Sequence, residues 1–253
     1  MRCRVIFLAV TLSACGAEQE PAASPPTSED TSELSTHSGG HGLIFNRHAH
    51  PYGASMVTWS ERIWKWIYRQ PAASNPTLDQ TGASCDVDQS GPVWFLASII
   101  PGASVFHGER TCTIPRHKAL LVQTAAILND FPCPDPAFHP APGQSLYDFL
   151  VAGAAPFIDS VNLLEVTIDG VRPDENMLDF RFTSKNLFHV TGDPSLQTVF
   201  DGCITGQAQP AVSDSYVFMV KPLPPGQHTL VWHTTDTFGM TGDTTLTYHL
   251  TVQ

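Results

Sequence analysis

Two kinds of hydrophobic pattern alternate along the chain from about residue 43 to its end. In Met56–Tyr68 (MVTWSERIWKWIY) apolar side chains recur every three or four residues, which predicts an amphipathic helix. Val93–Ile100 (VWFLASII) is apolar at nearly every position, which predicts a central strand with both faces buried. In Thr244–Val252 (TTLTYHLTV) apolar and polar residues alternate, so its Leu, Tyr, Leu and Val side chains should face a core.

A second helix is predicted from Leu146 to about Ala155, because Ser145 is a suitable N-cap and Pro156 should end the helix. The other apolar segments are short, alternate with a period of two, and are separated by turn-forming residues. We therefore predict a mainly β fold. It should be a single β-sandwich domain over residues 43–253, immunoglobulin-like or jelly-roll-like, with two accessory helices near 56–69 and 146–155.

The first fifteen residues, MRCRVIFLAVTLSAC, have the layout of an export signal, with a basic head, an apolar segment and small residues before Cys15. The ending LSAC resembles the lipobox of bacterial lipoproteins. The resemblance implies cleavage after residue 14 and acylation of Cys15, which would anchor the mature chain in a membrane. Gly16 in place of an acidic residue favours the outer membrane in that family. An ordinary secretory signal, cut at the same region without acylation, is the alternative.

Residues 15–42 follow the signal and contain almost no large apolar side chain. Such a segment cannot bury enough apolar surface to offset the entropy of ordering. We therefore expect a lipidated cysteine followed by a disordered tether, with a typical reach on the order of 30 Å.

Motifs in the middle of the chain, NPTLDQTGASC, SGPVWFLAS and RTCTIPRHKALL, resemble a family of uncharacterised exported bacterial proteins. The C-terminal run LPPGQHTLVWHTTDTFG, followed by TTLTYHLTV, resembles the last strands of bacterial immunoglobulin-like sandwiches. Neither resemblance implies an activity.

The charge of the chain limits its partners, and its cysteines indicate its compartment. There are 13 Lys and Arg residues against 24 Asp and Glu, a formal net charge of −11, so a nucleic-acid partner is excluded. Setting aside Cys3 in the signal and the acylated Cys15, four cysteines remain, an even number that predicts two disulfides in an oxidising compartment. Three connectivities are open. The pairing favoured here is Cys85 with Cys112 and Cys133 with Cys203, since the first pair would bracket one strand and its return.

Two groups of residues are candidates for ligand binding. Trp59, Trp64, Trp66 and Tyr68 lie on the predicted first helix and could form a stacking platform for a glycan, although packing against a sheet would use the same rings. His41, His48 and His50 are the second group. The His-x-His spacing of the last two suits zinc or copper, while a polar segment that binds no metal is the alternative.

Enzymatic motifs are absent from the sequence. It contains no G-x-S-x-G, H-E-x-x-H, G-x-G-x-x-G or G-K-[ST] pattern, so no catalytic residue is assigned and an enzyme is the less favoured interpretation. We expect a membrane-anchored extracytoplasmic binding or envelope-associated module, with a glycan or another envelope component as its partner. One alternative is a secreted hydrolase of glycan or another polymer, using carboxylates such as Asp86 or Asp88 with Asp201 or Asp214. The other is a zinc- or copper-binding protein centred on the histidines.

Overall fold

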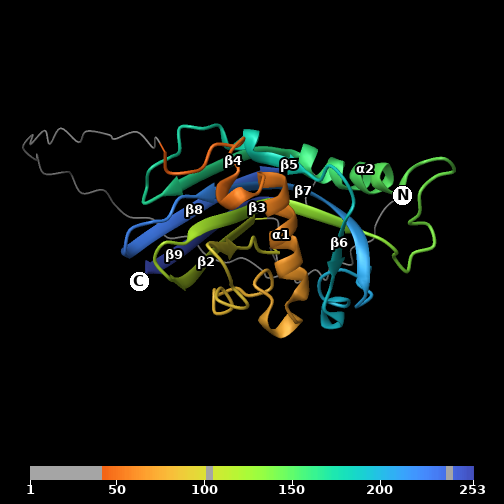
Figure 1. Cartoon of the computed structure of the whole chain (residues 1–253), viewed down its shortest axis with the longest axis horizontal. Coiled ribbons are helices and arrows are strands. Elements are labelled where there is room, and N and C mark those ends of the chain that lie inside the picture. The colour runs from red at the N-terminus through yellow and green to blue at the C-terminus, as the bar shows by residue number, and fades with distance from the viewer. Residues whose placement is uncertain (1–41, 101–104, 238–241) are drawn as a thin grey trace, which may run out of the picture. The chain divides into compact units, whose positions relative to one another are not determined.

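The computed structural model describes residues 42–100, 105–237 and 242–253. The predicted signal, Cys15, the tether up to residue 41 and His41 lie outside the described residues. The described part is a β-sandwich of two mixed sheets with two helices, as the sequence predicted (Figure 1).

Sheet A has five strands in the order β1-β3-β7-β5, with β6 also paired to β7, and sheet B has four in the order β2-β9-β8-β4. The pairs β1–β3 and β2–β9 are parallel, and the other pairs are antiparallel. The strands of sheet A are β1 (Val93–Leu96), β3 (Ala119–Asp130), β5 (Arg181–Thr183), β6 (Phe188–Thr191) and β7 (Ala208–Val220). Those of sheet B are β2 (Val105–Ile114), β4 (Val161–Ile168), β8 (Gly226–Asp236) and β9 (Asp243–Val252).

One hydrophobic core lies between the two sheets. The alternation in β9 is confirmed, because its apolar side chains are all buried in this core: Leu246, Tyr248, Leu250 and Val252. Across the sheet, Trp232 of β8 stacks on Tyr248 with ring centroids 5.6 Å apart.

A second core lies on the outer face of sheet A, under helix α1 (Met56–Arg69). The helix crosses β3 and β7, as Figure 1 shows, and Ser55 caps it by accepting from the backbone N–H of Thr58 at 3.2 Å. Ile63, Trp66 and Ile67 are completely or almost completely buried there. Sheet A is therefore covered on both faces.

The prediction of a central strand over Val93–Ile100 is wrong in extent and position. Strand β1 ends at Leu96 and forms an edge of sheet A. It is apolar on both faces because Val93 packs in the core under α1 while Trp94 and Leu96 pack between the sheets. Since β1 pairs only with Ala119–Val122, the rest of β3 has no strand partner on that side among the described residues.

Helix α2 (Leu146–Asp159) continues past Pro156, where the sequence predicted its end. A proline in the last turn removes one backbone hydrogen bond, whereas ending the helix there would withdraw Phe157 and Ile158 from the core. The helix packs against β3, β7 and β4.

Two disulfides join loops to the sandwich, in the pairing that the sequence favoured. Cys85 bonds to Cys112 on β2, and Cys133, just after β3, bonds to Cys203 in the loop before β7. Disulfides of this kind place the domain in an oxidising, extracytoplasmic compartment. No helix among the described residues is long and apolar enough to cross a membrane.

The long loop between α1 and β1 is fixed by a buried cation. The Arg110 guanidinium donates to the carbonyl oxygens of Asp79 at 2.5 Å and Ala97 at 2.9 Å, and to the Tyr248 hydroxyl at 2.7 Å. Because Arg110 belongs to β2 and Tyr248 to β9, these bonds attach the loop to sheet B.

We expect Trp66→Ala to lower the free energy of unfolding by about 3–5 kcal/mol, because it leaves a large cavity between α1 and sheet A. It also removes the bond from Trp66 Nε1 to the Val87 carbonyl oxygen, 2.8 Å long. Urea unfolding followed by circular dichroism measures the change. Val199→Ala, at an exposed position, is the control. A loss of less than about 1 kcal/mol for Trp66→Ala would contradict the prediction that packing of this ring stabilises the fold.

Candidate functional site

A cavity of about 320 Å³ lies where β1 ends and β3 continues alone, and we call it the β3-edge cavity. Its walls come from α1, the loop between α1 and β1, the segment after β1, the second half of β3, α2 and the loop before β7. The lining residues are Trp64, Tyr68, Thr77, Ser98, Ile99, Ile100, Gln123, Thr124, Ala126, Ile127, Leu128, Asn129, Phe157, Phe200 and Asp201.

Three aromatic rings in contact with one another form one wall of this cavity. Trp64 and Tyr68, one helical turn apart on α1, meet edge to face with centroids 5.9 Å apart. Tyr68 meets Phe200 in the same way at 5.6 Å. The Trp64 indole is held in place because its Nε1 donates to the Ser215 hydroxyl at 3.2 Å. The wall is thus mainly apolar, and the Tyr68 ring with its phenol hydroxyl lies between the other two rings.

Two polar side chains of the lining have buried atoms without a hydrogen-bond partner among the described residues: Gln123 Nε2 and Thr77 Oγ1. Gln123 is 2% exposed and Thr77 is 7% exposed. Two other polar lining groups are satisfied within the protein, since Thr124 donates to the Tyr216 carbonyl oxygen and Asn129 to that of Leu150. An unpartnered buried donor costs about 1–3 kcal/mol, so the free groups point to a water molecule or a ligand.

A pair of carboxylates lies near Phe200: Asp201 lines the cavity, and Asp130 is its neighbour outside the lining. Asp201 accepts from the Tyr68 hydroxyl at 3.1 Å and from the backbone N–H of Cys203 at 2.9 Å. Asp130 belongs to the end of β3, is 2% exposed, and its Oδ2 has no hydrogen-bond partner among the described residues. One oxygen of each carboxylate lies within 4.8 Å of the other.

Burial and like charge change the acid–base behaviour of this pair. Burial, followed by the charge of Asp201, raises the pKa of Asp130 to about 7. Burial and the two carboxylates raise the pKa of Tyr68 well above its ordinary value, so the phenol stays protonated and donates. Near neutral pH the Asp130 carboxyl group is therefore partly protonated.

The carboxylate pair does not form a transition-metal centre. The third atom within the same 4.8 Å group is the Cys203 sulfur, which is bonded to Cys133 and cannot act as a thiolate ligand. It is the single group of three or more potential ligands among the described residues. His48 and His50 are exposed and outside it, so their zinc or copper site stays a prediction.

An exposed tryptophan platform on α1 is not formed, contrary to one sequence hypothesis. Trp59 and Trp66 are buried, and their Nε1 atoms donate to the Pro51 and Val87 carbonyl oxygens at 2.9 and 2.8 Å. Packing on the apolar face of sheet A explains this, because that face would otherwise be open to water. Of the four predicted residues, Trp64 and Tyr68 alone line the β3-edge cavity.

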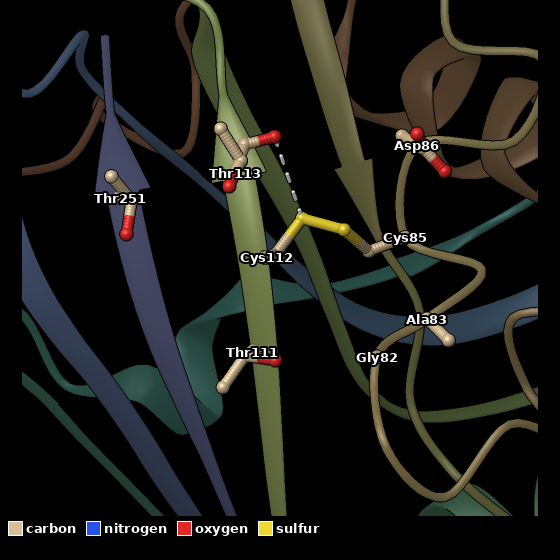
Figure 2. A pocket seen from close by; sticks show the side chains of 8 residues that line it. All are labelled: Gly82, Ala83, Cys85, Asp86, Thr111, Cys112, Thr113 and Thr251. Atoms are coloured by element: carbon tan, nitrogen blue, oxygen red, sulfur yellow. Dashed lines mark hydrogen bonds between the residues drawn. A yellow bond between two sulfur atoms is a disulfide. The ribbon is translucent and has the colours of Figure 1, made fainter.

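A second, shallower pocket of about 240 Å³ lies at the Cys85–Cys112 disulfide. Figure 2 shows threonines of β2 and β9 on one side of the disulfide and the segment from Gly82 to Asp86 on the other. Its lining is polar and includes Thr111, Thr113 and Thr251. None of the buried unpartnered atoms in the described chain belongs to this pocket, so it shows less sign of a missing ligand.

Two of the four carboxylates named for a hydrolase are bound to arginines elsewhere in the structure. Asp214 is 1% exposed and accepts from Arg181 Nη2 at 2.6 Å, while Asp88 forms an exposed ion pair with Arg69 at 3.0 Å. Asp86 lines the shallow pocket. Asp201 does lie beside another carboxylate, but that carboxylate is Asp130 and not Asp86 or Asp88.

Comparison with known proteins adds little. No protein-family model and no curated protein matches this chain. The chain is similar to a solved structure of PbICP-C in complex with falcipain-2, at 15% identity and a TM-score of 0.25, over 63% of this chain and 98% of that chain. A likeness this weak assigns no function.

Sequence reasoning missed Asp130, Gln123 and Thr77. A signal for the first was present, because Asp130 lies three residues before Cys133 and Asp201 lies two before Cys203. The favoured disulfide would therefore have brought these two carboxylates together. For Gln123 the signal is a polar residue within the apolar run ALLVQTAAIL, which has no obvious place in a fully buried strand.

We expect Asp130→Asn to gain stability relative to the wild type as pH rises. Because the pKa of Asp130 is about 7 in the folded state, the unfolded chain loses its proton first, and wild-type stability falls between about pH 4 and about pH 7. The asparagine variant lacks this loss. Between about pH 5 and about pH 8 its advantage should grow by about 2–3 kcal/mol.

Urea unfolding at the two pH values measures this difference, with Asp86→Asn, at an exposed position, as the control. An unchanged difference between wild type and Asp130→Asn would show that this carboxyl group titrates in its ordinary range.

Proposed function

We propose that this chain is a lipid-anchored extracytoplasmic binding module, and that the β3-edge cavity takes its ligand. The observation that carries the proposal is the pair of buried, unpartnered polar groups, Gln123 Nε2 and Thr77 Oγ1, in the wall of an otherwise mainly apolar cavity. Small-molecule sites combine apolar walls with a few placed polar groups in this way.

The form of the cavity favours a small ligand over a polymer. Its volume of about 320 Å³ lies at the lower end of the range for small-molecule sites, roughly 300–1,000 Å³. Glycan binding remains a prediction, and the residues that support it are reduced to Trp64 and Tyr68. A sugar ring stacked in the cavity would use them, whereas an extended polysaccharide would need an open surface.

The anchor is argued from the sequence. The lipobox-like LSAC ending places an acylated Cys15 ahead of a segment rich in Pro, Ser, Glu and Gly, so the domain would stand clear of the lipid headgroups. An outer-membrane destination follows from Gly16 within the same resemblance. The two disulfides agree with any extracytoplasmic position.

We expect Cys15→Ala to abolish acylation and move the protein from the membrane fraction to the soluble extracytoplasmic fraction. Metabolic labelling with a fatty acid, followed by fractionation, measures both effects. Cys3→Ala, inside the predicted signal, is the control and should leave labelling unchanged. Labelling that persists in Cys15→Ala would refute the anchor while leaving the cavity proposal intact.

We expect Gln123→Leu to raise the free energy of unfolding by about 1 kcal/mol in the absence of ligand, because it removes the buried, unpartnered Nε2 group. Gln209→Leu is a matched control, since its equally buried amide donates to the Pro132 and Cys203 carbonyl oxygens at 3.0 and 2.9 Å. That variant should lose stability. Urea unfolding of both gives the comparison. A Gln123→Leu protein as destabilised as Gln209→Leu would mean that Gln123 serves the fold rather than a ligand.

A further inference from the structure

Negative charge at one end of the β3-edge cavity has no cationic partner in its walls. The lining contains Asp201 and no Lys, Arg or His. Behind Asp201 lies Asp130, with one buried oxygen that accepts no hydrogen bond in the described chain. The group facing both carboxylates is the Tyr68 phenol, which donates one neutral hydrogen bond to Asp201.

The aromatic wall lies beside these charges. Tyr68 belongs to both features, since it contacts Asp201 through its hydroxyl and Trp64 and Phe200 through its ring. Aromatic faces attract a cation through their quadrupole, most strongly where water is excluded. Carboxylate and aromatic rings together therefore select a ligand with a positive charge and an apolar body.

A metal ion fits this arrangement less well. Calcium takes six to eight oxygen ligands and zinc prefers nitrogen or sulfur. Here two carboxylates stand beside rings and aliphatic side chains, and the nearby sulfur belongs to a disulfide. An organic cation can satisfy both the charge and the apolar wall.

We propose that the β3-edge cavity binds an organic ammonium ion, with Asp201 and Asp130 as its counter-charges and the rings of Trp64, Tyr68 and Phe200 around its apolar part. The inference rests on the proposed binding function and names the ligand class. Gln123 and Thr77 supply hydrogen-bonding groups for a polar substituent on the rest of the ligand.

The test compares three probes of nearly equal shape with different charge: 2-phenylethylammonium, 2-phenylethanol and phenylacetate. Isothermal titration calorimetry on the full mature chain gives each Kd, and the NMR signal of the Trp64 indole N–H, assigned with Trp64→Phe, locates binding. We expect the ammonium to bind about tenfold or more tightly than the alcohol, and phenylacetate more weakly than both.

Two variants separate the charges. Asp201→Asn should weaken ammonium binding about tenfold while leaving the affinity for 2-phenylethanol unchanged, and the control Asp86→Asn should change neither affinity.

Asp130→Asn should weaken ammonium binding at about pH 8 and have little effect at about pH 5, where the wild-type carboxyl group is already protonated. Wild-type affinity for the ammonium should accordingly rise between these values. Asp201 and Tyr68 are the titratable groups that face Asp130, and the phenol stays protonated throughout.

The outcomes distinguish the two proposals. Equal binding of the ammonium and the alcohol at Trp64 would overturn the cation inference and leave a binding cavity. Failure of all three probes to shift the Trp64 signal would overturn both. Binding that is insensitive to Asp201→Asn would assign the carboxylate pair to the fold and overturn the cation inference.

Discussion

Sheet A has to be buried on both faces, and the rest of the domain follows from that constraint. β7 is buried at nearly every position, and β3 at most positions. Sheet B covers one face through the main core. The other face needs a second apolar layer, which α1 supplies with three tryptophans and Tyr68. The aromatic content of this helix is therefore explained by packing, and Trp64 and Tyr68 alone among these rings also face the β3-edge cavity.

The same constraint traps polar groups that a one-sided sheet would leave in water. Ser60, Ser213 and Ser215 satisfy one another under α1 through a chain of hydroxyl hydrogen bonds, with Ser60 Oγ 3.0 Å from Ser213 Oγ and Ser213 Oγ 2.9 Å from Ser215 Oγ. Gln123 and Asp130, on the neighbouring strand, are not satisfied in this way. They lie where β1 has already ended, so their strand is paired with β7 on one side and has no strand partner on the other among the described residues. The cavity thus lies where the burial of sheet A on its two faces is incomplete.

The sequence predicted the parts of this structure that depend on local periodicity. The apolar stripe of α1 and the apolar–polar alternation of β9 are reliable signals, because the same spacing of apolar residues recurs several times within each element. The length of β1 could not be predicted, since Val93–Ile100 is apolar throughout and its end is set by the loop that Arg110 and the Cys85–Cys112 disulfide hold in place. Nor could the cavity, whose walls come from residues separated by more than a hundred positions.

The carboxylate pair depends on a covalent constraint. Asp130 and Asp201 precede the two halves of the Cys133–Cys203 disulfide, so closing that bond brings two like charges together on a buried edge. Like charges in a shared site raise the pKa of one partner and oppose folding, and a disulfide contributes roughly 2–4 kcal/mol toward stability. The bond can therefore hold an arrangement that the carboxylates alone would resist. A repulsive pair maintained at the end of an aromatic-walled cavity is relieved by a proton or by a bound cation, and the latter links the disulfide, the acid pair and the cavity in one function.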